Sequence, residues 1–459
     1  MEHTVNQPIY ENMPRQYPPG PTGSGLLGNL SAMRRQGIMD FYINIWQKYG
    51  DFASFKIGPM RSYLITQPDH VQHVMVKNRD NYIKGMSHDR LRLSLGYGLL
   101  TSENPLWRTQ RRLMQPTYTP KGIRQFADMM GETTREMLGR WQKRPSTTIF
   151  SANQEMLQIT MSVISRAMFG LDISQNFVEA AEALTDILEY TSSTSNDIIS
   201  LPLSVPTPKN LKLKRALALI DDFIYGIIDQ RQKDGTGDDL LYMLMTARDE
   251  ETGEPMSRQQ LHDEVLVTFF AGHETTASLL SWTWYLLAQH PEVERRLHEE
   301  LARVLNGRSP TLDDLPQLTY TRMILDETLR LYSPVGLTAR DVVADDQIDG
   351  YQIDAGSMVV IFTHATHRHP DFWQYPYAFY PEHFSPEQVK ERPRYAYYPF
   401  GAGPRICIGS HFALMEAILI LAEAAQHYRL CLAPQPQIGT KFIGVVRPTH
   451  DILMHLKPR

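Results

Sequence analysis

The stretch FGAGPRICIG, residues 400–409, runs directly into a strongly helical segment and holds one of the two cysteines in the chain. Its glycines allow backbone conformations and close approaches that larger side chains would forbid. Cys407 precedes the expected helix, where unpaired N–H groups and the helix dipole favour a thiolate over a thiol. An apolar surround would keep water from the sulfur, and it consists of Phe400, Ile406 and Ile408. The stretch therefore predicts a soft, anionic metal ligand.

The number of cysteines restricts which metal Cys407 can bind. A structural zinc site takes four nitrogen or sulfur ligands, and no second cysteine lies nearby in the sequence. A single thiolate suits haem iron, onto which it pushes electron density that favours cleavage of the O–O bond. The alternative is a small buried core residue, the usual role of an isolated cysteine. We keep that interpretation for Cys431, which lies in the sequence RLCLAP and has no comparable context.

This stretch resembles the haem-binding signature of the cytochrome P450 superfamily. The matching positions are Phe400, Gly401, Gly403, Arg405, Cys407 and Gly409. The resemblance implies that the cofactor is haem b and that Cys407 is the ligand of its iron. The same resemblance assigns Phe400, Arg405 and Gly409 to the cofactor-binding loop. It also implies the P450 fold, which is mainly α with a small β region and holds the haem between a long central helix and the cysteine loop.

A second motif, FFAGHETT at residues 269–276, lies in the most hydrophobic part of the chain and resembles the family's oxygen-activation motif. Small Ala271 and Gly272 would let a helix pass close to a flat cofactor. The Thr275 hydroxyl can hydrogen-bond a distal oxygen ligand or hold a water, and Glu274 could feed protons inward. The alternative is a locally bonded polar turn, the usual role of such residues in a helix. We expect Glu274 and Thr275 to be catalytic.

A third motif pairs Glu327 with Arg330, whose spacing places both side chains on one helix face. Such pairs are commonly surface decoration, which is the alternative here. In the family that the chain resembles, the pair is a buried structural element completed by an arginine in a later Pro-Glu-Arg-Phe segment. In this chain the segment reads YPEHF at residues 380–384, so His383 replaces that arginine. The network therefore depends on a side chain whose charge can change near neutral pH.

The two carboxylates of a haem need cationic partners, and arginine pairs with a carboxylate in a planar, charge-assisted way. Trp107 and Arg111 stand at positions i and i+4 of an expected helix and resemble the family's Trp-x-x-x-Arg. Arg340 falls where the family places another propionate-binding arginine, and Arg405 lies in the signature itself. We expect these residues to bind the cofactor, with a solvated surface role as the alternative for each arginine.

Composition and charge exclude several classes of protein. Among the 459 residues, 42% are hydrophobic and 21% are charged, which is typical of a globular protein with a large core. The net charge of -5 argues against a nucleic-acid binder. Two cysteines cannot form a dense disulfide framework, so we expect a reducing cytoplasm. The first twenty residues lack the apolar core of a signal peptide, and no span of about 20 apolar residues predicts a transmembrane helix.

Hydrophobic periodicity predicts a mainly helical chain with a minor β region. Helices are expected at residues 106–114, 122–142, 154–169, 176–190, 211–232, 258–290, 291–305, 320–332 and 410–428. Strands are expected in a hairpin at residues 51–63, in a small sheet within 341–362 and after residue 428. We expect a stiff N-terminal lead-in at residues 1–20 and a single haem domain at residues 21–459.

The resemblance implies a monooxygenase that inserts one oxygen atom from O2 into a C–H or C=C bond of an apolar molecule. The residues expected to line its pocket, which could instead be ordinary core, are Leu100, Phe270, Ala271, Val335 and Leu337. The sequence around the motifs is most similar to bacterial fatty-acid hydroxylases, in which an arginine follows the glycine aligned with Gly58. Pro59 stands there instead, and Arg61 and Tyr63 are candidate replacements. A fatty acid, a terpenoid and a steroid-like molecule all stay open as substrates.

The resemblance also implies a monomer that receives electrons from NAD(P)H only indirectly, through a reductase and a ferredoxin or flavodoxin. A basic docking face for an acidic carrier is expected, with scattered surface charge as the alternative, at Arg108, Arg112, Lys121, Arg392 and Arg394. Three other interpretations stay open. A peroxide-driven haem enzyme would lack the Glu274–Thr275 pair, a haem sensor would have a protein side chain as sixth ligand, and a helical scaffold would be colourless.

Overall fold

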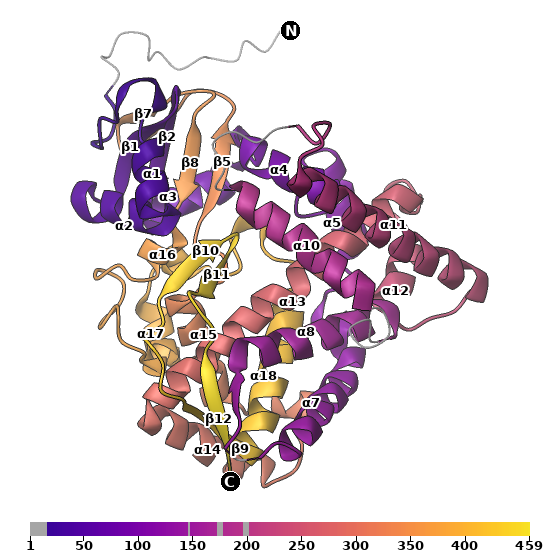
Figure 1. Cartoon of the computed structure of the whole chain (residues 1–459). Coiled ribbons are helices and arrows are strands. Elements are labelled where there is room, and N and C mark those ends of the chain that lie inside the picture. Colours follow the sequence, from indigo (N-terminus) through magenta and orange to yellow (C-terminus); the bar gives the residue numbers. More distant parts are fainter. Residues whose placement is uncertain (1–15, 146, 172–177, 196–201) are drawn as a thin grey trace.

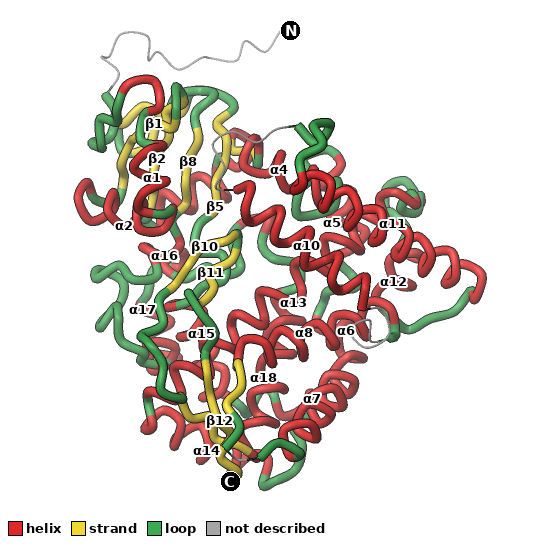
Figure 2. The backbone as a smooth tube through the Cα atoms, in the orientation of Figure 1, coloured by secondary structure: helices red, strands yellow, loops and turns green. Residues whose placement is uncertain are grey.

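The computed structural model describes residues 16–145, 147–171, 178–195 and 202–459. Helices make up most of this part of the chain, while the largest sheet stands at the N-terminal corner of the molecule (Figures 1 and 2). The mainly α architecture with a minor β region, expected from the sequence, is confirmed. None of the helices formed by the described residues is long and apolar enough to cross a membrane.

The largest sheet combines strands from the N-terminal region with strands from the second half of the chain. Its order is β1-β2-β8-β5-β3. The expected hairpin is confirmed as β1 (Phe52–Ile57) and β2 (Met60–Ile65), which pair antiparallel. Strand β8 (Met358–Ile361) runs parallel to β2, and β5 (Thr338–Val342) and β3 (Tyr82–Ile83) follow antiparallel. The sheet therefore holds the segment upstream of the cysteine loop against the N-terminal region.

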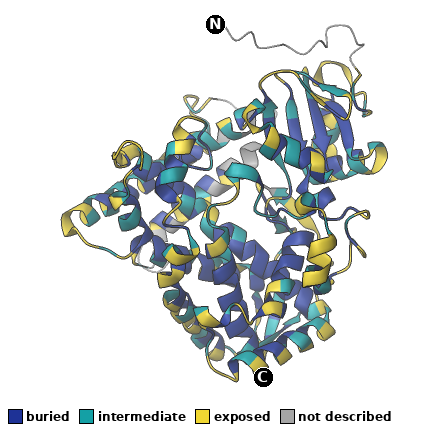
Figure 3. Ribbon diagram, turned by 180° about the vertical axis from the view of Figure 1, so that it is seen from behind, coloured by how far each residue is buried: buried dark blue, intermediate teal, exposed yellow. Residues whose placement is uncertain are grey.

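The centre of the molecule is α13 (Arg258–Gln289), whose side chains are buried on almost every face. A helix that is apolar all round is one that other elements surround. Figure 3 shows buried residues concentrated on the long helices in the middle of the molecule. The helices that pack against α13 include α8 (Ala152–Phe169), α11 (Pro208–Asp234), α14 (Pro291–Leu305), α15 (Thr319–Leu331) and α18 (Ser410–His427). This core holds both the FFAGHETT motif and the helix that follows the cysteine loop.

Shorter ladders complete the β region. Strands β4 (Ile149–Ser151), β12 (Leu453–Pro458) and β9 (Tyr428–Leu432) form one sheet, and β6 (Asp346–Ile348) pairs with β7 (Tyr351–Ile353). The last hairpin, β10 (Thr440–Ile443) with β11 (Val445–Pro448), contacts α13. The strands expected within residues 341–362 and after residue 428 are therefore confirmed.

The helix predictions are confirmed with two differences. The helix expected at 122–142 is divided into α6 (Pro120–Ile123), a short 3-10 turn and α7 (Ala127–Gln142). The helix expected at 176–190 starts in residues outside those described and appears as α10 (Val178–Ser195), while α5 (Leu106–Met114) has the predicted bounds. Sequence patterns missed the shorter helices, whose stability comes from packing rather than from a long repeat. They are α1 (Leu30–Gln36), α2 (Ile38–Tyr49), α3 (Pro68–Gln72), α4 (Gly85–Leu95), α12 (Leu240–Thr246), α16 (Thr363–Thr366) and α17 (Pro386–Glu391).

Candidate active site

The cysteine loop is held in place by a hydrogen bond within its own backbone and by a close contact with the N-terminal region. The backbone N–H of Cys407 donates to the Phe400 carbonyl at 2.8 Å. Gly403 has a φ of 67°, and a Cβ at this position would lie 2.1 Å from the Met75 carbonyl oxygen. Only glycine fits a left-handed position with a backbone carbonyl this close. The glycine is thus explained by contact with a segment more than 300 residues earlier in the chain.

Cys407 stands immediately before α18, as the sequence predicts. Burial raises the pKa of its thiol, while the backbone N–H of Gly409 and the nearby Arg111 guanidinium oppose that rise. The residue is nevertheless accessible to solvent by surface area. The residue is thus surrounded by protein atoms and still within reach of solvent. A sulfur with one backbone donor and an open side is suited to bind a metal, which would stabilise the thiolate.

On α13 the residues of the FFAGHETT motif divide between two faces. Ala271 is exposed and Thr275 is half-buried, whereas Glu274 is buried. The Thr275 hydroxyl donates to the Ala271 carbonyl at 2.9 Å. Gly272 faces α8, because a Cβ there would lie 2.9 Å from the Ile164 side chain. Its role is close packing between two helices, which corrects the expectation that it makes room for a cofactor.

Cationic side chains converge near the start of α4, as the charges of the haem carboxylates would require. Arg340 on β5 is buried, and it donates to the Ala339 carbonyl at 2.7 Å. Burial and the nearby Arg405 lower the pKa of Arg340 to about 10. Burial, Arg405 and Arg340 likewise lower the pKa of Lys84. The pKa values are lowered because the cations repel one another, so the potential at this place is positive. The carboxylate of Glu103, which pairs with Arg405, offsets this potential only in part. The donor set therefore fits a group with two carboxylates.

The sequence patterns did not indicate two residues of this cluster, Lys84 and Glu103. Lys84 Nζ donates to the Leu99 carbonyl at 3.2 Å, and its backbone N–H donates to Glu103 at 2.7 Å. Neither residue lies in a motif, and only the fold brings them to Arg405. His88, one turn along α4, has its pKa lowered by burial and by Lys84. A lysine that follows a short strand has no sequence pattern that would predict its place in this cationic cluster.

Trp107 and Arg111 share one face of α5 but contact different parts of the site. The Arg405 guanidinium lies 4.4 Å from the centre of the Trp107 ring. Arg111 donates to the Ile406 carbonyl at 2.8 Å, which places it beside the cysteine loop. Phe400 is half-buried and packs on the main core. The structure therefore gathers Trp107, Arg405 and Arg340 on one side, with Arg111 closer to the sulfur.

The residues expected to line a substrate pocket do not share one environment. Leu100 and Phe270 are partly buried and pack on the same core cluster as α13. Val335 is 43% exposed. Leu337 packs on a different cluster, formed by α2 and the large sheet. Among the five expected residues, Ala271 is the one that lies exposed on α13 itself.

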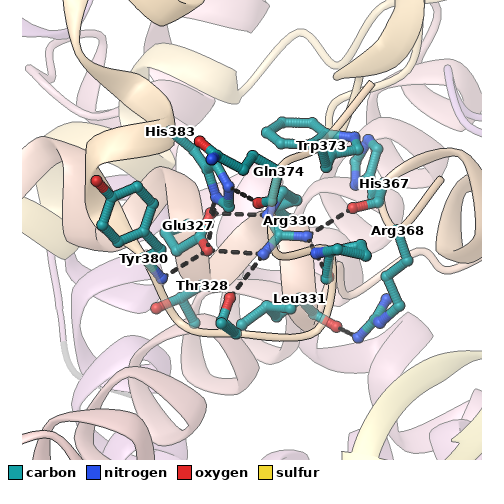
Figure 4. A network of polar contacts seen from close by, with 12 residues as sticks. Glu327, Thr328, Arg330, Leu331, His367, Arg368, Trp373, Gln374, Tyr380 and His383 are labelled. Atoms are coloured by element: carbon teal, nitrogen blue, oxygen red, sulfur yellow. Dashed lines mark hydrogen bonds and ion pairs between the residues drawn. The ribbon is translucent and has the colours of Figure 1, made fainter. Parts of the chain in front are cut away.

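The Glu327–Arg330 pair is fully buried and forms the polar network shown in Figure 4. Arg330 donates to both carboxylate oxygens of Glu327 at 2.7 Å and to the carbonyls of three other residues, His367, Pro376 and Ala378. The backbone N–H of Tyr380 also donates to Glu327. This network fixes the irregular segment that leads into the cysteine loop.

His383 keeps the contact that the family's arginine would make. Its Nδ1 lies 3.1 Å from Glu327 Oε1, and its Nε2 hydrogen-bonds the Gln374 carbonyl. A carboxylate and a carbonyl are both acceptors, so each ring nitrogen of His383 faces a group to which it can donate. Arg392 donates to the His383 carbonyl at 2.9 Å and covers the Trp373 ring. The histidine thus occupies the place of the arginine in the network around Glu327.

Glu274 has a partner that the sequence does not reveal. Arg447 on β11 forms an ion pair with its carboxylate. Burial raises the pKa of Glu274, and Arg447 opposes the rise. A second hidden carboxyl, Glu416 on α18, is also buried, and burial raises its pKa well above the usual range. The two partners of the first pair lie 173 residues apart, beyond the reach of any local motif.

Comparison with known proteins agrees with this geometry. The sequence profile of the family described as "Cytochrome P450" matches residues 18–456. Cyclooctatin synthase of Streptomyces melanosporofaciens is 34% identical, over 99% of this chain and 96% of the relative. Cyclooctat-9-en-7-ol 5-monooxygenase of the same species is also 34% identical, over 89% and 88%. A crystal structure described as the cytochrome P450DA heme domain superposes with a TM-score of 0.88 at 27% identity, covering 97% and 98% of the two chains. The chain belongs to the cytochrome P450 family and is a monooxygenase that oxygenates an apolar substrate.

Proposed function

We propose that the substrate of this monooxygenase is an uncharged cyclic terpenoid. The observation that carries the proposal is the likeness, over most of the chain, to two relatives named for cyclooctatin and cyclooctat-9-en-7-ol. Relatives of this kind oxygenate terpenoids. A terpenoid of fused or bridged rings presents mostly C–H surface, so its binding depends on apolar contact rather than on a charged anchor.

The residues that could hold a fatty-acid carboxylate are already engaged, which supports the same choice. The Arg61 guanidinium lies 3.6 Å from the centre of the Tyr17 ring and 3.4 Å from the Asp354 carboxylate. Tyr63 is buried, and its hydroxyl accepts from the Asp354 backbone N–H at 3.2 Å. A substrate carboxylate at this arginine would have to compete with the Asp354 carboxylate that is already paired with it.

We assign the following roles to the residues of the site. Haem, when bound, supplies the iron at which O2 is reduced and one oxygen atom is transferred. Cys407 holds that iron, while Lys84, Arg340 and Arg405 balance the carboxylates of the porphyrin. Glu274 and Thr275 pass protons inward, because the second oxygen atom leaves as water. Phe400 and Gly409 shape the loop around the sulfur.

An external carrier, a ferredoxin or flavodoxin reduced by an NAD(P)H-dependent reductase, supplies the electrons in this proposal. Arg108, Lys121 and Arg394 are exposed and can form a basic docking face. Arg112 instead pairs with Asp249 at 2.6 Å and with Glu251. Arg392, stacked on the Trp373 ring, is likewise occupied within its own fold. We further propose a monomeric, cytoplasmic protein with one haem domain from residue 21 onward.

The substrate class can be tested by titrating the ferric protein with small molecules and recording the shift in haem spin state. We expect cyclic terpene hydrocarbons and their monoalcohols to cause a saturable low-to-high-spin shift, and fatty acids of similar size to cause none. Replacing Arg61 by alanine should leave the terpenoid affinity unchanged. A fatty acid that shifts the spin state, and loses affinity at least tenfold in the R61A variant, would overturn the proposal, since loss of a charged hydrogen bond costs this much.

A further inference from the structure

The β10–β11 hairpin lies against the part of α13 that carries the FFAGHETT motif. The Ser278 hydroxyl donates to the Val446 carbonyl at 2.8 Å, and both residues are buried. Ser278 is one helical turn beyond Glu274, so the two residues share a face of α13. Arg447, next to Val446 in β11, forms the ion pair with Glu274. The hairpin is therefore attached to α13 at two adjacent turns.

The Glu274–Arg447 pair crosses the boundary between interior and solvent. The Glu274 side chain is 5% exposed, whereas that of Arg447 is 34% exposed. The carboxylate thus lies on the helix that lines the reaction site, and the guanidinium reaches it from the outer side. An arginine in this position can hold the carboxylate in one orientation and connect it to water.

Arg447 is the charged group that acts on Glu274 among the described residues. Burial favours the neutral acid and raises the pKa of Glu274, while Arg447 favours the carboxylate. The adjacent His273 stays neutral at physiological pH, because burial lowers its pKa to about 4. The charge of the proposed proton donor therefore depends on one residue of the hairpin.

The same hairpin also contacts the chain beside the expected substrate pocket. The Val446 backbone N–H donates to the Pro334 carbonyl at 2.9 Å. A Cβ on Gly336 would lie 3.2 Å from the Val446 side chain, so this segment and β11 are in close contact. Val335, an expected pocket residue, lies between these two contact points. The strand that carries Arg447 is therefore held by residues 334–336 as well as by α13.

We propose that Arg447 is a positioning residue that orients Glu274 for proton delivery. The inference rests on the proposed role of Glu274 in passing protons to the site. It adds a residue from the C-terminal strands to the α13 motif, and it gives the hairpin a function besides packing.

The test compares R447M, R447K, E274Q and the double variant E274Q/R447M with the parent enzyme, using a substrate that gives the spin-state shift. Methionine keeps the length of the side chain without the charge, and lysine keeps the charge. The matched control is R429M, because Arg429 on β9 pairs with Glu294 on α14 at 2.8 Å with a similar division of exposure, 38% and 8%. Turnover, KM, the hydrogen peroxide released per electron pair and the pH profile are measured for each protein.

We expect E274Q to lower kcat about a hundredfold and R447M about tenfold, both with KM unchanged, since general acid catalysis contributes factors of this order. In R447M more electrons should end in hydrogen peroxide, and R447K should recover most of the loss. In the E274Q background R447M should cause no further loss, because the interaction it removes is already absent. R429M should behave as the parent.

An infrared difference spectrum gives a readout that does not depend on turnover. At neutral pH, the difference between R447M and the parent should contain one additional protonated carboxyl band, and the difference between E274Q/R447M and E274Q should not contain it. Equal losses on adding R447M to the parent and to E274Q would show that Arg447 acts independently of Glu274, and the inference would be wrong. If E274Q itself left turnover and peroxide release unchanged, the proposed role of Glu274 would fail instead.

Discussion

The two cysteines of the chain differ in what surrounds the sulfur atom. Cys407 receives the Gly409 N–H and is close to the Arg111 guanidinium, whereas Cys431 lies in the β9–β12 ladder opposite His455. Only the first lies in a loop that matches the haem-binding signature. We therefore expect C407H to abolish the strongly red-shifted carbon monoxide band of the reduced protein, since that band requires a thiolate donor. The C431S variant is the control.

Difference spectra of the reduced, carbon monoxide-bound proteins make this comparison directly, with haem content measured in parallel. A C407H protein that kept both its haem and the red-shifted band would contradict the assignment of the iron ligand. Loss of the band in C431S with normal haem content would contradict it as well.

At the scale of single residues, the sequence could predict the roles of residues that lie close together along the chain. It could not predict which distant residues contact them in the folded protein. The cysteine loop, the Glu327–Arg330 pair and the position of Thr275 each lie within a few residues and so carry a local signature. Arg447 and Lys84 reach the site from separate strands and loops, where an isolated cation has no distinguishing neighbours. Gly272 is a different case. Its motif was recognised from the sequence, but the sequence did not show that this glycine faces α8.

At the scale of elements, α13 also controls the loop that precedes α5. Asp263 accepts the Tyr97 N–H and Glu264 accepts the Leu99 N–H, both at 2.8 Å. Glu264 is fully buried, and burial raises its pKa from 4.5 to about 8. In this pH range the folded protein binds a proton that the unfolded chain has lost, so stability falls as the pH rises from about 4.5 to about 8.

The E264Q variant removes this dependence, since an amide can still accept the Leu99 N–H without becoming charged. We expect it to match the parent at pH 5 and to exceed it at pH 8 by up to about 4 kcal/mol, the upper limit for a shift of this size. Urea unfolding at both pH values measures the difference, with the exposed Glu250→Gln as the control. An equal difference at both pH values would be inconsistent with the buried carboxyl.

Long helices were predictable because α14 carries an apolar repeat over several turns and α13 is a long, almost continuously apolar segment. The pairing of strands was not, since β2 and β8 carry no mark that assigns them to one another. The division of the helix expected at residues 122–142 was also missed, because the 3-10 turn at residues 124–126 contains no proline or glycine that would mark it. Element type is thus a local property, and partner choice is not.

At the scale of the whole molecule, the exposed cations near α5 and α6 predict how the carrier docks. Charge reversal at Arg108 and Lys121 together should raise the KM for an acidic ferredoxin or flavodoxin about tenfold at low salt, because rim charges govern encounter. Added salt should reduce the difference, since exposed charges are screened. Arg303→Glu on the exposed side of α14 is the control. Stopped-flow reduction at several ionic strengths would measure it, and a salt-independent effect would oppose the proposal.

The order of strands in the large sheet affects how the protein folds during its synthesis on the ribosome. Strand β2 leaves the tunnel early, yet its neighbour β8 is made far later, since Ile65 pairs with Ile361. At the usual pace of translation this gap lasts roughly 15 to 60 s. During that interval one edge of the β1–β2 hairpin has no native partner, which invites pairing with other nascent chains. We therefore expect the yield of folded protein to rise when this edge is shielded by a chaperone until the second half of the chain has been made.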